Sequence, residues 1–194
     1  MNAKESIKNS LKILLFFTII TGLIYPVIIY SIGQLFFKEK ADGSMIINNK
    51  KVVGSSLIAQ KFSGKKYFWP RPSAIDYNPM PSGGSNLSLT SKALVQQYND
   101  GKALFLKENL LPDTTDVPSD ILFASASGVD PDISRAAALL QVNRISRARK
   151  FTSEQKQKLV NLVDEQTVKK QFGFLGEEGV NVLKLNIKLD EMSK

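Results

Sequence analysis

The sequence predicts an α+β protein in which a single N-terminal transmembrane helix precedes one domain with a small, mainly antiparallel sheet and two or three helices. Two observations predict this class. Residues 13–37 contain no charged side chain, whereas the rest of the chain mixes polar and apolar residues as folded domains do. In that remainder, short strand-like segments and longer helix-like segments are separated by stretches rich in proline and glycine.

The uncharged run is long enough to cross a bilayer. A helix rises about 1.5 Å per residue and the hydrocarbon core is roughly 30 Å thick, so about 20 apolar residues are sufficient. A cleaved signal peptide is the alternative, but its apolar region is usually about 7 to 15 residues long and ends in small residues. The run is longer and lacks such an end, so we expect a tail over residues 1–12, a transmembrane helix over 13–37 and a domain over 38–194.

The transmembrane segment has one face suited to helix packing. Thr18, Gly22 and Pro26 recur every four residues, which places small or backbone-altering residues along that face. Such residues favour close packing against a partner helix in lipid, although glycine and proline are common in transmembrane helices generally. Lysines flank the segment in nearly equal numbers, so the positive-inside rule alone does not decide its orientation.

The domain begins with a predicted hairpin and a long loop. Residues 45–47 and 52–54 are typical of two short strands joined by a polar turn. Residues 64–86 are predicted to form a loop, because their prolines exclude regular helix and their paired glycines permit unusual dihedral angles. The loop also concentrates aromatic side chains: Tyr67, Phe68, Trp69 and Tyr77. Long loops in compact domains are usually functional or disordered, and aromatic residues argue against disorder.

Helices dominate the predicted second half of the domain. Apolar spacing predicts helices over about 91–107, 134–150 and 153–170, and Ser134 is placed to cap the second of them. Residues 121–124 are predicted as a strand. A last half-buried strand is predicted where apolar residues alternate with polar ones, at Leu183, Leu185, Ile187 and Leu189.

The composition excludes several kinds of chemistry. The chain has no cysteine and no histidine, which removes disulfides, thiolate nucleophiles, histidine-based triads and Cys/His metal sites. The formal net charge of +8 favours anionic surfaces such as lipid headgroups. The basic residues are spread along the chain without interleaved aromatic residues, so no nucleic-acid partner is predicted.

Two patches match known ligand sites only in part. The run Ser82–Asn86 could cradle a phosphate, but it lacks the Walker lysine and its place between a strand and a helix, which favours an ordered turn. Asp113, Asp116 and Asp120 miss the spacing of a calcium loop, so no metal site is predicted.

Three arginines lie along the predicted helix 134–150, namely Arg144, Arg147 and Arg149. They could bind an anion or the carboxylate of a partner, or they could form a solvated helix face, and the sequence leaves both interpretations open. Basic residues near the end of a helix also complement its dipole.

Five segments carry a pattern that extends over nearly the whole chain after the transmembrane run. In order they are GSSLIAQKF (54–62), YFWPRPSA (67–74), SGGSNL (82–87), ASASGVDP (124–131) and VNVLKLN (180–186). In this order the motifs resemble those of the KdpC family, whose members are subunits of the Kdp high-affinity potassium-transporting P-type ATPases. The chain departs from the family pattern at three positions: Ala59 for glycine, Asp132 for histidine and Arg135 for proline.

The resemblance implies an accessory subunit without catalytic residues of its own. The implied partners are the potassium-channel-like chain and the P-type ATPase chain of the Kdp complex, so ATP and K⁺ are handled by the complex and no cofactor is bound firmly by this chain. The family topology places the N-terminus in the cytoplasm and the domain on the far side of the cell (inner) membrane. The expected fold is therefore one transmembrane helix followed by an extracytoplasmic α+β domain.

Two roles follow from the resemblance: assembly or stabilisation of the complex, and a catalytic-chaperone role that raises the ATP affinity of the P-type ATPase chain. Gln60 matches the glutamine that the family associates with nucleotide. Because an extracytoplasmic domain cannot meet cytosolic ATP, we favour conformational coupling over direct contact. The alternative is a membrane-tethered extracytoplasmic enzyme that uses Asp130 and Asp132, or a scaffold domain.

Partner contacts are expected from two sets of residues. In the transmembrane segment they are Thr18, Gly22 and Pro26. In the domain they are Tyr67, Phe68, Arg71, Pro72, Asn78, Ser82, Gly83, Gly84, Ser85, Asn86, Asp130, Arg144 and Arg149.

Overall fold

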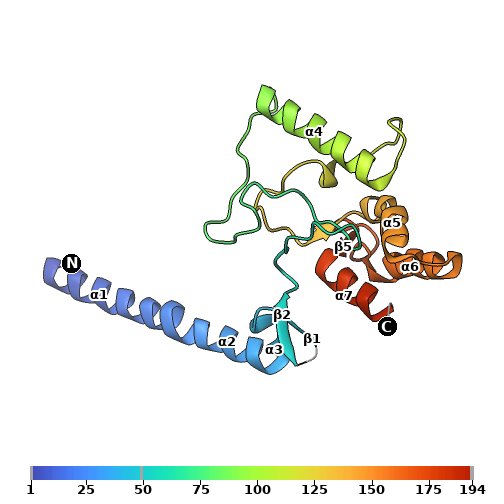
Figure 1. The fold of residues 1–194 in the computed structure, drawn as a ribbon. Coiled ribbons are helices and arrows are strands. Elements are labelled where there is room, and N and C mark those ends of the chain that lie inside the picture. The colour runs from blue at the N-terminus through green and yellow to red at the C-terminus, as the bar shows by residue number, and fades with distance from the viewer. Residues whose placement is uncertain (1, 49, 193–194) are drawn as a thin grey trace. The chain divides into compact units, whose positions relative to one another are not determined.

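A computed structural model describes residues 2–48 and 50–192 (Figure 1). The chain divides into two compact units, one ending at Ser55 and the other beginning at Ser56. The first unit opens with a long helix built from α1 (Ala3–Ile19), the π-helical segment η1 (Ile20–Ile24) and α2 (Tyr25–Phe36). Among the described residues it is the one helix that is long and apolar enough to cross a membrane.

The π-helical segment has a local cause. Pro26 lies in the first turn of α2 and has no N–H to donate to the carbonyl of Gly22 four residues earlier. The N–H of Tyr25, just before it, donates to the carbonyl of Ile20 five residues earlier, which gives a single π turn within an α-helix. Because Gly22 lies within η1 and Thr18 precedes it in α1, the predicted packing face runs across this irregular turn.

After the short helix α3 (Lys38–Ala41), strands β1 (Met45–Asn48) and β2 (Lys51–Ser55) pair antiparallel, with an irregular register between Ile46 and Ile47. The predicted hairpin is therefore confirmed, although its turn residue Asn49 lies outside the described residues. The hydroxyl of Ser55 donates to the carbonyl of Gly43 at 2.7 Å and closes the base of the hairpin.

The second unit is an α+β domain whose small sheet is antiparallel, as predicted. Its helices are α4 (Lys92–Asn109), the 3₁₀ turn η2 (Ser119–Ile121), α5 (Arg135–Arg149), α6 (Ser153–Gln166) and α7 (Val182–Met192). Its sheet has the order β3-β5-β4, from β3 (Asp132–Ile133), β5 (Gly179–Asn181) and β4 (Thr167–Val168). The prediction of two or three helices was therefore too low, because the described part of this unit contains four α-helices.

Local capping explains where two of these helices begin. The hydroxyl of Ser134 accepts the N–H of Ala137 at 3.1 Å, which confirms Ser134 as the cap of α5. Thr152 and Gln155 form a reciprocal capping box at the start of α6. The three helices predicted after the loop are confirmed as α4, α5 and α6, with bounds that differ from the prediction by a few residues.

The predicted last strand is wrong, because residues 183–189 belong to helix α7. The alternation that suggested a strand is also compatible with a helix, since Val182, Leu185 and Leu189 recur at helical spacing and are buried. The side chain of Asn181 accepts the N–H of Lys184 at 3.1 Å and caps the helix.

The strand predicted over 121–124 is also wrong. The carbonyl of Ser119 accepts the N–H groups of Leu122 and Phe123 at 3.1 and 3.0 Å, which closes a helical turn instead. Ile121 and Leu122 are neighbours in sequence and both are buried, whereas successive residues of a strand point to opposite faces.

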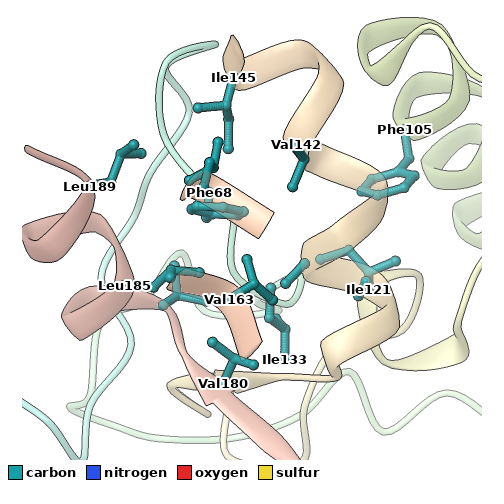
Figure 2. Close-up of a cluster of buried hydrophobic side chains, with 14 of the residues drawn as sticks. Phe68, Phe105, Ile121, Ile133, Val142, Ile145, Val163, Val180, Leu185 and Leu189 are labelled. Carbon is teal, nitrogen blue, oxygen red and sulfur yellow. The ribbon is translucent and has the colours of Figure 1, made fainter. Parts of the chain in front are cut away.

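The core of the second unit lies between α4, α5, α6, α7 and the small sheet, and Phe68 inserts into it from the long loop (Figure 2). The side chain of Phe68 is fully buried and belongs to the same cluster as Val142 and Ile145 of α5 and Leu185 of α7 (Figure 2). The stretch between Ser55 and Lys92 is described throughout and forms neither helix nor strand, as predicted for residues 64–86. Phe68 is therefore where an irregular segment becomes part of the core.

We expect Phe68→Ala to lower the free energy of unfolding by about 3–5 kcal/mol, because it removes a fully buried aromatic ring and leaves a cavity. Chemical denaturation of the full-length chain in detergent measures this, with the fluorescence of the single tryptophan, Trp69, as the signal. Phe174→Ala is the matched control, since Phe174 is 73% exposed and its loss should change stability by no more than about 0.5 kcal/mol. Equal stability of the two variants would contradict the central place of Phe68.

Candidate functional site

The candidate site is built around residues 64–86, here called the aromatic loop. Its segment at Phe68 and Trp69 runs through the domain without strand partners, so its backbone groups need other hydrogen-bond partners. Asn186 of α7 accepts the N–H of Phe68 at 2.8 Å and donates to its carbonyl at 3.0 Å. Gln141 of α5 does the same for Trp69, at 2.7 and 3.2 Å. Two buried amide side chains thus take the place of neighbouring strands.

Arg144 of α5 fixes the start of the same loop. Its side chain is buried, with 3% of the residue exposed. One terminal nitrogen donates to three carbonyls of the loop backbone, those of Gly64 (3.4 Å), Lys65 (2.6 Å) and Tyr67 (3.0 Å). A planar guanidinium can hold several acceptors at fixed angles, which a lysine cannot do.

The remaining donors of Arg144 bind side chains. Its Nε donates to Asn109 at the end of α4 at 2.9 Å, and its second terminal nitrogen donates to Gln141 at 2.7 Å. The guanidinium also lies 4.1 Å from the ring centre of Trp69, a cation–π distance. Burial lowers the pKa of Arg144 to about 10, so the group keeps its charge at neutral pH. Arg144 therefore links α4, α5 and the aromatic loop.

Arg149, at the end of α5, forms a second link. It pairs with Asp190 of α7 at 2.6 Å and donates to the carbonyl of Lys66 at 2.8 Å. Asp190 also accepts the hydroxyl of Tyr67 at 3.1 Å, and burial together with this carboxylate raises the pKa of Tyr67. The opening of the loop is thereby held to both α5 and α7.

The middle of the loop is held by Arg71, which pairs with Asp130 at 2.7 Å. The other oxygen of Asp130 accepts the N–H of Asp132 at 3.0 Å, so this carboxylate is engaged on both sides. Tyr77 returns to the same point, where its hydroxyl donates to the carbonyl of Arg71 at 2.8 Å. Burial, with a smaller effect of Asp76, raises the pKa of Tyr77 to about 12.

The glycine-rich end of the loop packs closely against residues 125–128. The N–H of Gly83 donates to the carbonyl of Ser127 at 3.1 Å. Gly128 has a φ of +72°, and a Cβ there would lie 2.5 Å from a side-chain carbon of Ile75. Only glycine fits this position, because any side chain would meet both an unfavourable dihedral and a clash.

The predicted residues of the domain therefore fall into three groups. Those that the structure brings together in hydrogen-bonded contacts are Tyr67, Phe68, Arg71, Gly83, Asp130, Arg144 and Arg149. Gly84 packs against the carbonyl of Ala126 and Pro72 lines a hollow described below. Those that remain at the exposed surface of the loop are Asn78, Ser82, Ser85 and Asn86.

Two of the residues that were predicted to contact a partner are buried. Phe68 is fully buried and Arg144 is 3% exposed, so any influence of either on a partner must act through the loop that it holds. Of the two interpretations of the arginines, solvated face or ligand contact, neither describes Arg144, which is a buried internal clamp. Gln60 is half-buried and follows Ala59, whose N–H donates to the carbonyl of Val129 at 2.8 Å. The residues Thr18, Gly22 and Pro26 lie in the other compact unit.

Three residues that organise the site were not predicted as site residues: Asn109, Gln141 and Asn186. All three are buried, with 0%, 0% and 2% of the residue exposed. Gln141 follows buried Ala137 and Ala138 by one helical turn, so a polar residue on an apolar helix face was the available signal.

An open apolar hollow of about 480 Å³ lies beside the clamped segment. It is lined mainly by apolar and aromatic side chains, among them Phe62, Trp69, Pro72, Leu104, Phe105 and Ile121. Within residues 2–48 and 50–192, no cluster of three His, Cys, Asp or Glu side chains is placed to hold a metal ion. The arrangement is suited to holding a shaped surface in place, since its charged groups are engaged with the loop itself.

Comparisons with known proteins agree with the motif pattern. The family model described as "KdpC: K+-transporting ATPase, c chain" matches residues 7–191. Proteins named potassium-transporting ATPase KdpC subunit show similarity over nearly the full chain. One from Leptospira interrogans is 44% identical, covering 95% of this chain and 93% of its own, and one from Geotalea uraniireducens is 42% identical, covering 98% and 100%. One from Paraburkholderia phytofirmans is 46% identical and covers 90% and 91%.

We expect Arg144→Ala to lower the free energy of unfolding by about 3 kcal/mol or more, because several buried acceptors lose their donor at once. Arg144→Lys should rescue little of this loss, since an ammonium cannot reach the same set of acceptors. Arg147→Ala is the control on the same helix, with an exposed side chain and an expected change within about 0.5 kcal/mol. Denaturation followed by Trp69 fluorescence compares the three, and full rescue by lysine would contradict the clamp.

Tyr77 should lose its phenolic proton at a higher pH than an ordinary tyrosine does. Because its folded-state pKa of about 12 exceeds the usual value near 10, the folded state holds the phenolic proton more tightly. Its contribution to stability is therefore complete below about pH 10 and is lost as the pH rises through about 12. The difference in phenolate absorbance between the wild-type chain and Tyr77→Phe measures this titration, and a difference curve centred near pH 10 would contradict the burial of this hydroxyl.

Proposed function

The chain belongs to the KdpC family of K⁺-transporting ATPase c chains, and from this premise we propose that it is a non-catalytic accessory subunit of an ATP-driven potassium uptake complex. The observation that carries the proposal is the clamped aromatic loop. Arg144, Gln141 and Asn186 use their polar groups to hold a loop with exposed edges in one conformation. A preformed surface of this kind binds a partner without the cost of ordering a flexible loop.

The proposed partners are the potassium-channel-like chain and the P-type ATPase chain of the complex. We propose a cytoplasmic N-terminus and an extracytoplasmic domain, with the helix Ala3–Phe36 crossing the cell membrane. The charges beside the helix do not oppose this orientation, because large domains are translocated largely regardless of their charge. Thr18, Gly22 and Pro26 would then face a helix of a partner chain across the irregular turn η1.

The proposed effect on ATP affinity is indirect. A domain outside the membrane changes nucleotide affinity only by contacting one conformation of the pump more favourably than another. A tenfold change needs about 1.4 kcal/mol of such differential contact, which a few well-placed residues supply. Gln60 follows Ala59, whose N–H donates to the carbonyl of Val129. Gln60 would contribute to this differential contact rather than bind ATP itself.

The test is affinity purification of the tagged full-length chain in mild detergent from cells that express the whole complex. We expect mass spectrometry to identify a P-type ATPase chain and a channel-like chain, and the eluate to hydrolyse ATP when potassium is added. Omission of this chain should abolish the potassium-stimulated activity or raise the ATP concentration that it requires about tenfold. Recovery of the chain alone from cells shown to contain both partners would overturn the proposal.

A further inference from the structure

The connection between β4 and β5 contains a second aromatic segment, residues 171–175, here called the aromatic turn. Its backbone is closed by hydrogen bonds between its own residues. The N–H of Gln171 donates to the carbonyl of Leu175 at 2.8 Å, and the N–H of Leu175 donates back at 2.9 Å. The N–H of Phe174 also donates to the carbonyl of Gln171, at 3.2 Å. The side chains at its tip are therefore displayed by a closed turn.

The two phenylalanines of this turn are exposed. Phe172 is 86% and Phe174 is 73% exposed, and Leu175 is 49% exposed. Each aromatic ring could remove a large apolar area from water on binding, so its exposure is costly in the isolated chain. Neither ring contributes to the core, which makes folding an inadequate reason for their presence.

The backbone at Phe172 strengthens this point. Its φ is +53°, in the left-handed region where glycine or asparagine is favoured and a bulky residue is uncommon. Asparagine at this position would suit the turn better and would expose less apolar surface. A phenylalanine that is unfavourable for both the backbone and the solvent indicates a role outside the isolated chain.

Charges beside the turn indicate what covers it. Lys169 and Lys170 precede it, and Glu177 and Glu178 follow it, so its formal charge is balanced. An anionic lipid surface attracts a segment with excess positive charge, whereas a segment with balanced charges gains little from it. A protein surface with an apolar pocket and a rim of both charge signs matches this arrangement, because interfaces commonly have an apolar centre and a polar rim.

We propose that the aromatic turn inserts Phe172 and Phe174 into an apolar pocket on another protein chain of the potassium-transporting complex, outside the hydrocarbon core of the membrane. This inference rests on the proposed function as an accessory subunit. It adds a docking point separate from the aromatic loop. The sequence motifs had predicted partner contacts in the aromatic loop but none in the aromatic turn. Phenylalanine side chains at the centre of a desolvated pocket are typical of the few residues that dominate an interface.

A photo-crosslinking amino acid with an aromatic side chain, placed at position 172 of the full-length chain in the assembled complex, tests the occupant directly. We expect a crosslink to one identified protein chain of the complex. The same group at position 89 is the control, since Leu89 is 89% exposed and lies outside both aromatic segments. Crosslinking at 172 to lipid, or to no chain beyond the level seen at 89, would overturn the proposal.

The second measurement is retention of the partners by the double variant Phe172→Asn with Phe174→Ser. We expect the partners to be lost from the purified complex about tenfold faster than from the wild type, with the thermal stability of the isolated chain unchanged or raised. Leu89→Ser should behave as the wild type. Retention of the partners by the double variant at the wild-type level overturns this inference alone, whereas failure of the wild-type chain to retain them overturns the proposed function.

Discussion

The fold of the second unit depends on how it satisfies the backbone of one irregular segment, Phe68 and Trp69. A segment that enters the core outside any sheet would leave its N–H and carbonyl groups unpaired, which is costly in a low-dielectric interior. Asn186 and Gln141 pair these groups two at a time, from α7 and α5 respectively. The positions of the two helices are thereby tied to the loop, and the aromatic ring of Phe68 can fill the space between them.

Arg144 applies the same constraint to the start of the loop, at Gly64 to Tyr67. Its charge is buried, yet each guanidinium nitrogen reaches an oxygen, which offsets the cost of taking the group out of water. Together with Arg149, which binds Asp190 and the carbonyl of Lys66, it fixes the start of the loop to the C-terminal half of α5. The conformation of the start of the loop is therefore set by interactions in the interior.

Local signals in the sequence were sufficient for the elements whose ends are determined locally. The hairpin, the cap of α5 at Ser134 and the loop were predicted because turns, caps and prolines act over a few residues. The pattern at α7 was ambiguous, because leucines that alternate with lysine also recur at helical spacing, and packing against α6 decides between them. The burial of Arg144 could not be predicted, since it depends on carbonyl groups about 80 residues earlier in the chain.

The two aromatic segments differ in the burial of their rings, and the difference follows from the contacts that each segment makes within the chain. Phe68 is flanked by backbone groups that side chains of α5 and α7 can satisfy, so its ring is buried and stabilises the fold. The aromatic turn is closed by short-range hydrogen bonds, including one from the N–H of Gly173 to the carbonyl of Lys170 at 3.2 Å, while its two phenylalanine rings are exposed to solvent. A segment whose backbone is closed by local hydrogen bonds and whose rings are exposed can be covered by another protein with little rearrangement, which is the property a docking point requires.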